Sequence, residues 1–446
     1  TITGLPTVAV WSDPVALACD LPDVYRPRRP TDSPLYKLLL DHLDRFRGVY
    51  EDAFEHRWGR WRNVVDEVVE RFLDCGVLEA GFARVRCPEC RAEFLVAFSC
   101  KCRYFCPSCH AKRLEQWSAW LESDVLAPVP HRQFVFSLPK RLRPYFLWRR
   151  RLLGDLARTA AATTTAFIRA ATSEDVSVGI VLSIQTHGSL LNWNPHIHAL
   201  VTDGGFLADG TFVSLPLHDT EALTEAFRRS VLKLFVDQEL FEPEVAEAML
   251  AWMHSGFSVD DSVWLPDGDT RGHDRLARYC ARNPLALERM RYDADASTVH
   301  YTSDKSTGPT AGSHSFDALE FLALLVAQIP DKGQVLQRYY GYYSNRQRGA
   351  RRAASEAATA WHTATDVGAD PADPASSHLS NRQIRLRWAE LLRRIYDVDP
   401  LRCPACGTQM RIISFILRPS VIDRILAHIR DKGRDPRAGP WAEAVA

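Results

Sequence analysis

The sequence predicts an α+β fold, because it contains both β-type runs and longer segments with helical periodicity. The clearest β-type runs are residues 133–138, 176–186 and 196–202. Apolar residues recur at helical spacing over residues 33–75. With 446 residues, of which 46% are apolar and 10% aromatic, the chain can build the cores of two or three domains.

Before Pro130 the sequence predicts helices around a cysteine-rich block. Residues 33–75 are expected to form an amphipathic helical pair, residues 87–110 hold most of the cysteines, and a further helix follows. After Pro130 the pattern changes to a strand over residues 133–138 and a long helix over residues 147–171.

The next two strands are separated only by the short loop GSLLNWNP, which favours pairing as a hairpin. Further helices are predicted after them, interrupted by two short strands. In order, the expected elements are strands 176–186 and 196–202, helices 220–241, 243–254 and about 274–281, strands 290–293 and 298–302, and helix 316–328.

Charge is balanced over the whole chain, since 55 Lys and Arg residues face 55 Asp and Glu residues. Net charge therefore gives no indication of an anionic partner, but local basic patches suit phosphate contacts. These patches comprise Lys140, Arg141, Arg143, Arg149, Arg150 and Arg151, then Arg346, Arg348, Arg351 and Arg352, and then Arg382, Arg385, Arg387, Arg393 and Arg394.

The apolar stretches are too short for a membrane-spanning helix, which needs about 20 residues. The first residues, TITGLPTVAV, lack the basic start and cleavage site of a secretory signal. The sequence therefore predicts a cytoplasmic protein.

Eight of the eleven cysteines lie in two short segments, a pattern that indicates metal binding in a reducing compartment. Cys87-Pro-Glu-Cys90 and Cys106-Pro-Ser-Cys109 have the spacing of a four-thiolate structural zinc site, expected to serve DNA docking. The same block contains further candidate ligands that leave a ligand exchange or a second site open. They are Cys100, Cys102 and His110.

A second partial site lies near the carboxyl terminus, where Cys403-Pro-Ala-Cys406-Gly forms one knuckle without a matching pair downstream. His428 or a partner chain would have to complete it, or the knuckle binds no metal.

His196-Ile197-His198 lies in a predicted strand, where alternate side chains share a face. The two imidazoles would then form a hook for a divalent ion, with Ile197 in the core. A hairpin in which paired positions sum to 383 would place His187 opposite His196 and Gln185 opposite His198. Gln185, His187, Asn283 and Glu288 all remain candidate third ligands at this stage.

Several segments together resemble the bacterial rolling-circle insertion-sequence transposases over nearly the whole chain. They are NWNPHIHALVTDGGF, RLARYCARNPLALERM, RYYGYYSNRQRG and the cysteine block from Cys87 to His110. That family is similar to the HUH endonucleases, named for the His-hydrophobic-His hook. The resemblance implies an antiparallel-sheet catalytic core with flanking helices behind an amino-terminal zinc-binding domain.

The resemblance assigns His196 and His198 to the hook for Mg²⁺ or Mn²⁺, and Tyr279 to the nucleophile that attacks single-stranded DNA at the element ends. A 5′-phosphotyrosine and a free 3′-hydroxyl would result. Two-tyrosine members carry another tyrosine four residues upstream, where this chain has Arg275. It therefore resembles the single-tyrosine, common-region branch, in which a homodimer or successive reactions would replace the second tyrosine.

Tyr339 and Tyr343 form a rival pair at helical i, i+4 spacing, and we interpret them as DNA-contacting or packing residues. The predicted DNA-binding residues are Lys140, Arg141, Arg143, Tyr339, Tyr343, Arg346 and Arg348.

Four segments are expected in total. They are a helical and zinc-binding domain (1–125), an HUH-type catalytic domain (126–352), a linker (353–381) and a basic carboxyl-terminal unit with one knuckle (382–446). Alternative functions are a plasmid-type replication initiator or relaxase with the same chemistry, and a non-catalytic zinc protein that binds DNA.

Overall fold

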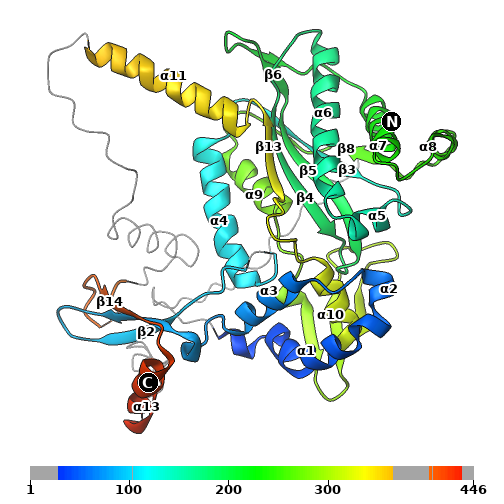
Figure 1. Cartoon of the computed structure of the whole chain (residues 1–446). Coiled ribbons are helices and arrows are strands. Elements are labelled where there is room, and N and C mark those ends of the chain that lie inside the picture. The colour runs from blue at the N-terminus through cyan, green and yellow to red at the C-terminus, as the bar shows by residue number, and fades with distance from the viewer. Residues whose placement is uncertain (1–28, 103, 365–400, 404, 434–446) are drawn as a thin grey trace, which may run out of the picture.

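The computed structural model of the chain describes residues 29–102, 104–364, 401–403 and 405–433. Helices pack around several antiparallel sheets, so the predicted α+β class is confirmed (Figure 1). No helix within these ranges combines the length and the apolar composition needed to cross a membrane.

The central sheet is antiparallel and has the strand order β13-β4-β5-β3-β8, with β9 beside β3. Its long strands are β3 (His131–Ser137), β4 (Gly179–His187) and β5 (Trp193–Thr202). The shorter strands are β8 (Ser258–Asp260), β9 (Trp264–Leu265) and β13 (Gln337–Gly341).

Strands β4 and β5 are buried on both faces, and their alternating side chains enter two different cores. On one face, Ile184 and Ile197 pack with the helices that follow β3, including α6, where Ala and Leu residues at helical spacing make a flat apolar stripe. These helices are α5 (Arg143–Trp148), α6 (Leu152–Thr172), α7 (Thr220–Asp237) and α8 (Pro243–Leu250).

The other face of the sheet is covered by α4 (Pro107–Asp124) and α9 (Thr270–Cys280), which pack against each other and against Val181 and Leu200. Helix α4 runs from the cysteine-rich region to the central sheet (Figure 1). It therefore joins the cysteine-rich region to the site described below.

The amino-terminal helices share one hydrophobic core with a segment far along the chain. Helix α1 contacts both α10 and β10. The predicted boundary at residue 125 stays a prediction, although the packing adds residues 285–329 to the amino-terminal core. The elements involved are α1 (Pro34–Ala53), α3 (Asn63–Leu73), β10 (Met290–Asp293), β11 (Thr298–Thr302), β12 (Ser313–Asp317) and α10 (Ala318–Ala327).

A separate three-stranded sheet joins the two ends of the described chain in the order β14-β1-β2. Strands β1 (Phe82–Arg86) and β2 (Glu93–Ala97) form a hairpin, and β14 (Arg411–Ile416) pairs with β1. Helix α13 (Pro419–Asp431) lies beside this sheet (Figure 1). The remaining short elements are η1 (Pro30–Asp32), α2 (Glu55–Trp58), η2 (Leu78–Ala80), β6 (Gly204–Phe206), β7 (Phe212–Ser214) and η3 (Leu287–Arg289).

The hairpin register differs from the predicted one. Gln185 pairs with His196, where the prediction placed His187, and Ser183 pairs with His198. The predicted pairing was wrong because the register shifts between Gln185 and His187, so that His187 faces Trp193. This irregularity follows the loop geometry, in which Leu191 adopts a left-handed φ of 61°.

The tyrosine-rich segment is not helical as its i, i+4 spacing suggested. Residues Gln337–Gly341 form β13, an edge strand, and the chain then turns into helix α11 (Asn345–Ala364). This helix extends past residue 353, at which the sequence predicts the linker to begin. Residues 365–381 of the predicted linker, and residues 382–400 with the third basic patch, lie outside the described residues.

Candidate active site and metal centres

The two histidines of the hook lie on β5 and point to the face of the sheet that α9 covers. Their ring centroids are 4.9 Å apart, and Ile197 between them is fully buried in the opposite core. Strand alternation therefore places both imidazoles on one face, as the sequence predicts.

Hydrogen bonds orient both rings. His196 Nδ1 donates to the backbone oxygen of Asn194 at 2.7 Å, which leaves Nε2 as the lone-pair nitrogen of the neutral ring. Nδ1 of His198 lies 2.9 Å from the side-chain amide of Gln133. The His196 ring, which donates through Nδ1, presents Nε2 to a metal, the arrangement typical of metal-binding histidines. The His198 ring would do the same with the amide oxygen of Gln133, in place of the amide nitrogen, turned toward its Nδ1.

Burial keeps both imidazoles neutral. It lowers the pKa of His196 to about 4, with smaller effects from Arg282, Arg143 and Lys305, and it places the pKa of His198 well below its ordinary value. Neutral imidazole is the form that binds a divalent ion, so the pair is ready for a metal at neutral pH.

Tyr279 lies beside this pair, in the last turn of α9. Asp269 caps the start of the helix by accepting from the backbone N–H of Gly272 at 2.8 Å. The Tyr279 ring meets His198 edge-on at a centroid distance of 5.4 Å. Tyr279 is 47% exposed, whereas most large side chains near it are buried. A nucleophilic tyrosine must be open to solvent in this way to reach DNA.

Arg282 and Gln185 fix the end of the helix. The guanidinium of Arg282 lies 5.0 Å from the Tyr279 ring centroid and donates to Asp304 at 2.7 Å. Gln185 Nε2 donates to the backbone oxygens of Tyr279 and Cys280 at 3.1 and 2.7 Å. Sequence reasoning missed the roles of Arg282 and Asp304. Arg282 lies in the segment RLARYCARNPLALERM, where only the tyrosine was assigned a role, and Asp304 belongs to no recognisable motif.

The candidates for a third metal ligand are not equivalent. Oε1 of Gln185 is buried without a hydrogen-bond partner, and Gln185 lies directly opposite His196. His187 Nε2 is also buried and unpartnered. However, His187 does not form a group with both hook histidines in which the ligand atoms all lie within 4.8 Å of one another, because no histidine of the described chain belongs to such a group of three ligands. Glu288 is exposed, and Asn283 Oδ1 accepts from the backbone N–H of Leu285. The geometry therefore favours Gln185.

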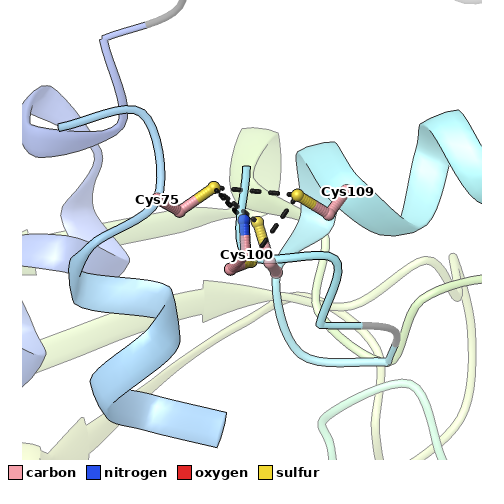
Figure 2. Close-up of side chains that lie close together, drawn as sticks. Cys75, Cys100 and Cys109 are labelled. Carbon is pink, nitrogen blue, oxygen red and sulfur yellow. Dashed lines mark hydrogen bonds between the residues drawn. The ribbon is translucent and has the colours of Figure 1, made fainter. Parts of the chain in front are cut away.

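The cysteines form two clusters, and neither is the predicted set of four. In the first cluster Cys75 and Cys100 join Cys106 and Cys109. Figure 2 labels three of these residues, Cys75, Cys100 and Cys109. The Sγ atom of Cys75 lies 3.9 Å from that of Cys106 and 3.7 Å from that of Cys109. The Sγ atoms of Cys100 and Cys109 are 3.5 Å apart. Zinc with four thiolates at 2.3 Å sets sulfur atoms about 3.8 Å apart, so this cluster suits a structural zinc ion.

The predicted grouping of Cys87 and Cys90 with Cys106 and Cys109 was wrong, because the β1–β2 hairpin carries the first knuckle away from α4. Cys87 and Cys90 lie instead with Cys403 and Cys406. Cys75 escaped detection because it stands alone after α3, without a C-x-x-C partner.

The two remaining zinc-ligand candidates are engaged elsewhere. Cys102 Sγ donates to the backbone oxygens of Val68 and Cys100. His110 accepts from the backbone N–H of Tyr104 at 3.1 Å, and its other nitrogen lies 2.7 Å from the backbone oxygen of Ala281. His110 therefore ties α4 to the end of α9 near Tyr279 and does not join a cysteine cluster.

The predicted DNA-contacting residues divide into exposed and structural ones. Lys140, Arg141 and Arg346 are exposed. Arg143 donates to the backbone oxygen of Leu138, and Arg348 stacks on Trp120 at 5.0 Å.

The two tyrosines of that prediction are held inside the fold. Tyr343 is fully buried and cannot stack on a base, because its hydroxyl lies 2.7 Å from His131 Nε2 and accepts from the backbone N–H of Ala127. Tyr339 is half-buried and accepts from Trp117 Nε1 at 2.7 Å.

An antiparallel sheet with a His-hydrophobic-His strand, next to a cysteine-rich region with the sulfur spacing of a zinc site, is the arrangement that the resemblance to the HUH endonucleases implies. Two family models match the chain and together span more than half of it. A transposase zinc-binding domain matches residues 46–138, and a putative transposase matches residues 179–351. The chain is therefore similar, over most of its length, to insertion-sequence transposases that carry a zinc-binding domain of the IS91 type.

Two relatives are similar over most of their length. The transposase for insertion sequence element IS801 of Pseudomonas savastanoi pv. phaseolicola is 28% identical over 79% of this chain and 84% of the relative. The putative transposase y4qJ of Sinorhizobium fredii (strain NBRC 101917 / NGR234) is 24% identical over 72% of this chain and 81% of the relative.

One solved structure was also matched, the non-structural protein 1 N-terminal origin-recognition/nickase domain from the emerging human bocavirus. It is 12% identical, covers 47% of this chain and all of its own, and has a TM-score of 0.22. A TM-score this low supports no argument about the fold.

Proposed function

We propose that this transposase cleaves and rejoins single-stranded DNA at the ends of its element through a covalent bond to Tyr279. The observation that carries the proposal is the position of Tyr279. It is an exposed tyrosine whose ring contacts His198 of the buried histidine pair. A nucleophile must lie next to the groups that hold the scissile phosphate, and Tyr279 meets this condition.

The other tyrosines of the C-terminal motif do not meet it. Tyr343 is fully buried, and the hydroxyl of Tyr339 is bound by Trp117. Arg275, which replaces the second tyrosine of two-tyrosine relatives, is exposed on the same helix. We therefore infer that one chain supplies one nucleophile.

The reaction exchanges one phosphate ester for another. The Tyr279 oxygen attacks phosphorus, the bond from phosphorus to the 3′-oxygen breaks, and the proton lost by the tyrosine is recovered on the departing 3′-hydroxyl. Because one phosphate ester replaces another, a 3′-hydroxyl can reverse the reaction and rejoin strands without an energy source. Arg282, which lies over the Tyr279 ring, offers positive charge to the phosphate under attack.

We assign the catalytic metal to His196, His198 and Gln185. The residues fit such an ion, since the imidazoles are neutral and Oε1 of Gln185 is a buried acceptor without a partner. When bound, Mg²⁺ or Mn²⁺ would polarise the scissile phosphate.

A plasmid-type replication initiator or relaxase would use the same chemistry. The match to a transposase zinc-binding domain and the two transposase relatives favour transposition over that alternative.

The proposal is tested with Tyr279→Phe on a labelled single-stranded oligonucleotide from the element end. This change keeps the ring and removes the only atom that attacks phosphorus, so cleavage should disappear while folding and DNA binding persist. Wild-type protein should form a denaturant-resistant adduct at the 5′ side of the nick, and mass spectrometry should place the nucleotide on Tyr279. Tyr339→Phe is the matched control and should keep cleaving.

An adduct on another tyrosine, or one that persists in Tyr279→Phe, would overturn the assignment of the nucleophile. Absence of any nicking by the wild-type protein with Mg²⁺ or Mn²⁺ would instead favour a DNA-binding protein without catalysis.

A further inference from the structure

The second cysteine cluster is assembled from the two ends of the described chain. Cys87 and Cys90 follow β1, whereas Cys403 and Cys406 precede β14. The Sγ atoms of Cys87 and Cys406 lie 3.5 Å apart, as do those of Cys90 and Cys403. These separations are close to the roughly 3.8 Å between sulfurs in a tetrahedral four-thiolate zinc site.

The two knuckles also share one backbone geometry, which is independent of the sulfur distances. The backbone N–H of Cys87 donates to the backbone oxygen of Ala92, and the backbone N–H of Cys403 donates to that of Thr408. In both knuckles the acceptor is five residues further along the chain and the distance is 2.8 Å. The residue four after the first cysteine has a left-handed φ in both knuckles, 63° at Arg91 and 72° at Gly407. Two matched turns of this kind present two pairs of thiolates to one ion.

The surrounding packing brings the ends together. Strand β14 pairs with β1, and a small apolar core joins Val85 and Phe94 to Leu401 and Met410 around the buried Cys87 and Cys403. On the other side of the sheet, Ile422 and Leu426 of α13 pack on Leu78 and Phe82. These cores are small, so a metal ion would contribute a large share of their stability.

We propose that Cys87, Cys90, Cys403 and Cys406 bind a second structural zinc ion, which makes residues 401–433 a part of the amino-terminal zinc-binding domain. The matched zinc-binding family model ends at residue 138 and contains only half of this site. The ion would clamp β14 and α13 onto the β1–β2 hairpin, and would hold the two ends of the described chain together around the catalytic region.

The first test is the zinc content of the purified full-length chain, measured by native mass spectrometry. Wild-type protein should carry two ions. Cys403→Ser combined with Cys406→Ser should carry one, as should Cys87→Ser combined with Cys90→Ser. Cys102→Ser is the matched control, because Cys102 is buried in the same domain, belongs to neither cluster and donates its thiol to backbone oxygens, and it should keep both ions.

The second test is alkylation by iodoacetamide, which identifies the partners. Cys90 and Cys406 are exposed, so only a bound ion can protect them from the reagent. In Cys403→Ser/Cys406→Ser, Cys90 should become reactive while Cys75 of the first cluster stays protected, which shows that the rest of the domain is folded. Neither readout depends on DNA cleavage, so failure of the proposed catalytic function would leave this result unaffected.

Three outcomes would overturn the proposal. One is a Cys403→Ser/Cys406→Ser variant that keeps two ions or a protected Cys90. Another is loss of both ions in that variant, since the first cluster takes no ligand from residues 401–433. The third is recovery of the second ion when the two double variants are mixed, which would show that the knuckles come from different copies.

Discussion

Buried polar atoms without partners gather around the histidine pair. Gln185 Oε1, His187 Nε2 and Arg282 Nε all lack a hydrogen bond within the described chain. Each such atom costs about 1–3 kcal/mol of stability if nothing satisfies it, so a group of them indicates a place that water, an ion or a ligand occupies. In an HUH-type site these ligands would be a divalent ion and a phosphate.

The metal assignment predicts distinct effects for three variants. His196→Ala and His198→Ala should abolish cleavage but preserve binding of single-stranded DNA, because affinity comes mainly from phosphate contacts elsewhere. Gln185→Leu should raise the metal concentration for half-maximal cleavage by at least about tenfold, the lower limit for loss of a group that supports a metal site. The measurement is cleavage against metal concentration, in which Mn²⁺ should act at least as well as Mg²⁺.

Gln185→Glu is the control for this prediction, since it keeps an oxygen at the ligand position and loses only the donor to the carbonyls of Tyr279 and Cys280. It should restore the metal response. An unchanged metal response in Gln185→Leu would exclude Gln185 as a ligand and would favour Asn283 or His187 as the third ligand.

The hook histidines and Tyr279 could be predicted from the sequence because each lies in a short local motif. The choice among third-ligand candidates could not, since it depends on a register shift of β4 against β5 between Gln185 and His187. Cys75 could not be predicted either, because its partners meet it only after α3, β2 and α4 have packed.

At the level of elements, α10 shows how Arg150, an arginine of a predicted basic patch, serves structure together with Arg62. This helix is buried on almost every side, and its carboxyl-terminal carbonyls are satisfied by two arginines. Arg62 donates to the oxygens of Val326 and Ile329, and Arg150 to those of Ala327 and Ile329. The positive charges also oppose the negative end of the helix dipole.

Arg150→Leu should therefore lower the free energy of unfolding by roughly 2–4 kcal/mol, because it leaves buried carbonyls without donors. Burial lowers the pKa of Arg150 to about 9, so the wild-type side chain is still charged at neutral pH. Arg149→Leu, at an exposed neighbouring position, should change stability by no more than about 0.5 kcal/mol. Urea unfolding followed by circular dichroism compares the two, and equal effects would contradict the capping role.

Long periodic elements such as α6 and α7 were predictable, and so were the short strands β10 and β11, whereas β13 was not. The segment that forms β13 carries tyrosines at a spacing typical of a helix, yet it pairs with β4 at the edge of the sheet. Pairing with a neighbour decides the structure of so short a segment, because its intrinsic preference is weak. The strands β1, β2 and β14 likewise depend on contacts between distant parts of the chain.

At the scale of the whole molecule, several buried neutral histidines make stability depend on pH. Burial and the neighbouring His273 lower the pKa of His131 to about 3, and burial lowers that of His196 to about 4. Unfolding returns both groups to ordinary values near 6.5, so the unfolded chain binds more protons below that pH. Stability is therefore full above about pH 6.5 and falls as the pH drops toward the folded values.

We expect the urea midpoint to fall between about pH 7 and pH 5, with each such histidine contributing up to about 1.4 kcal/mol per pH unit. His131→Gln removes one titrating group, so its stability should fall less steeply than that of the wild type even if it is lower throughout. Zinc is kept in excess at every pH. Parallel pH profiles for the two proteins would show that His131 contributes nothing.

The core shared by α1, α3 and α10 has a consequence for synthesis on the ribosome. The apolar faces of α1 and α3 emerge early, but Phe321 and Leu322, which belong to the same core, follow only after most of the catalytic region has been translated. At about 5–20 residues per second the delay is on the order of twelve to fifty seconds. During this interval the nascent amino-terminal region exposes apolar surface, and a chaperone that binds this surface would therefore determine the yield of folded protein.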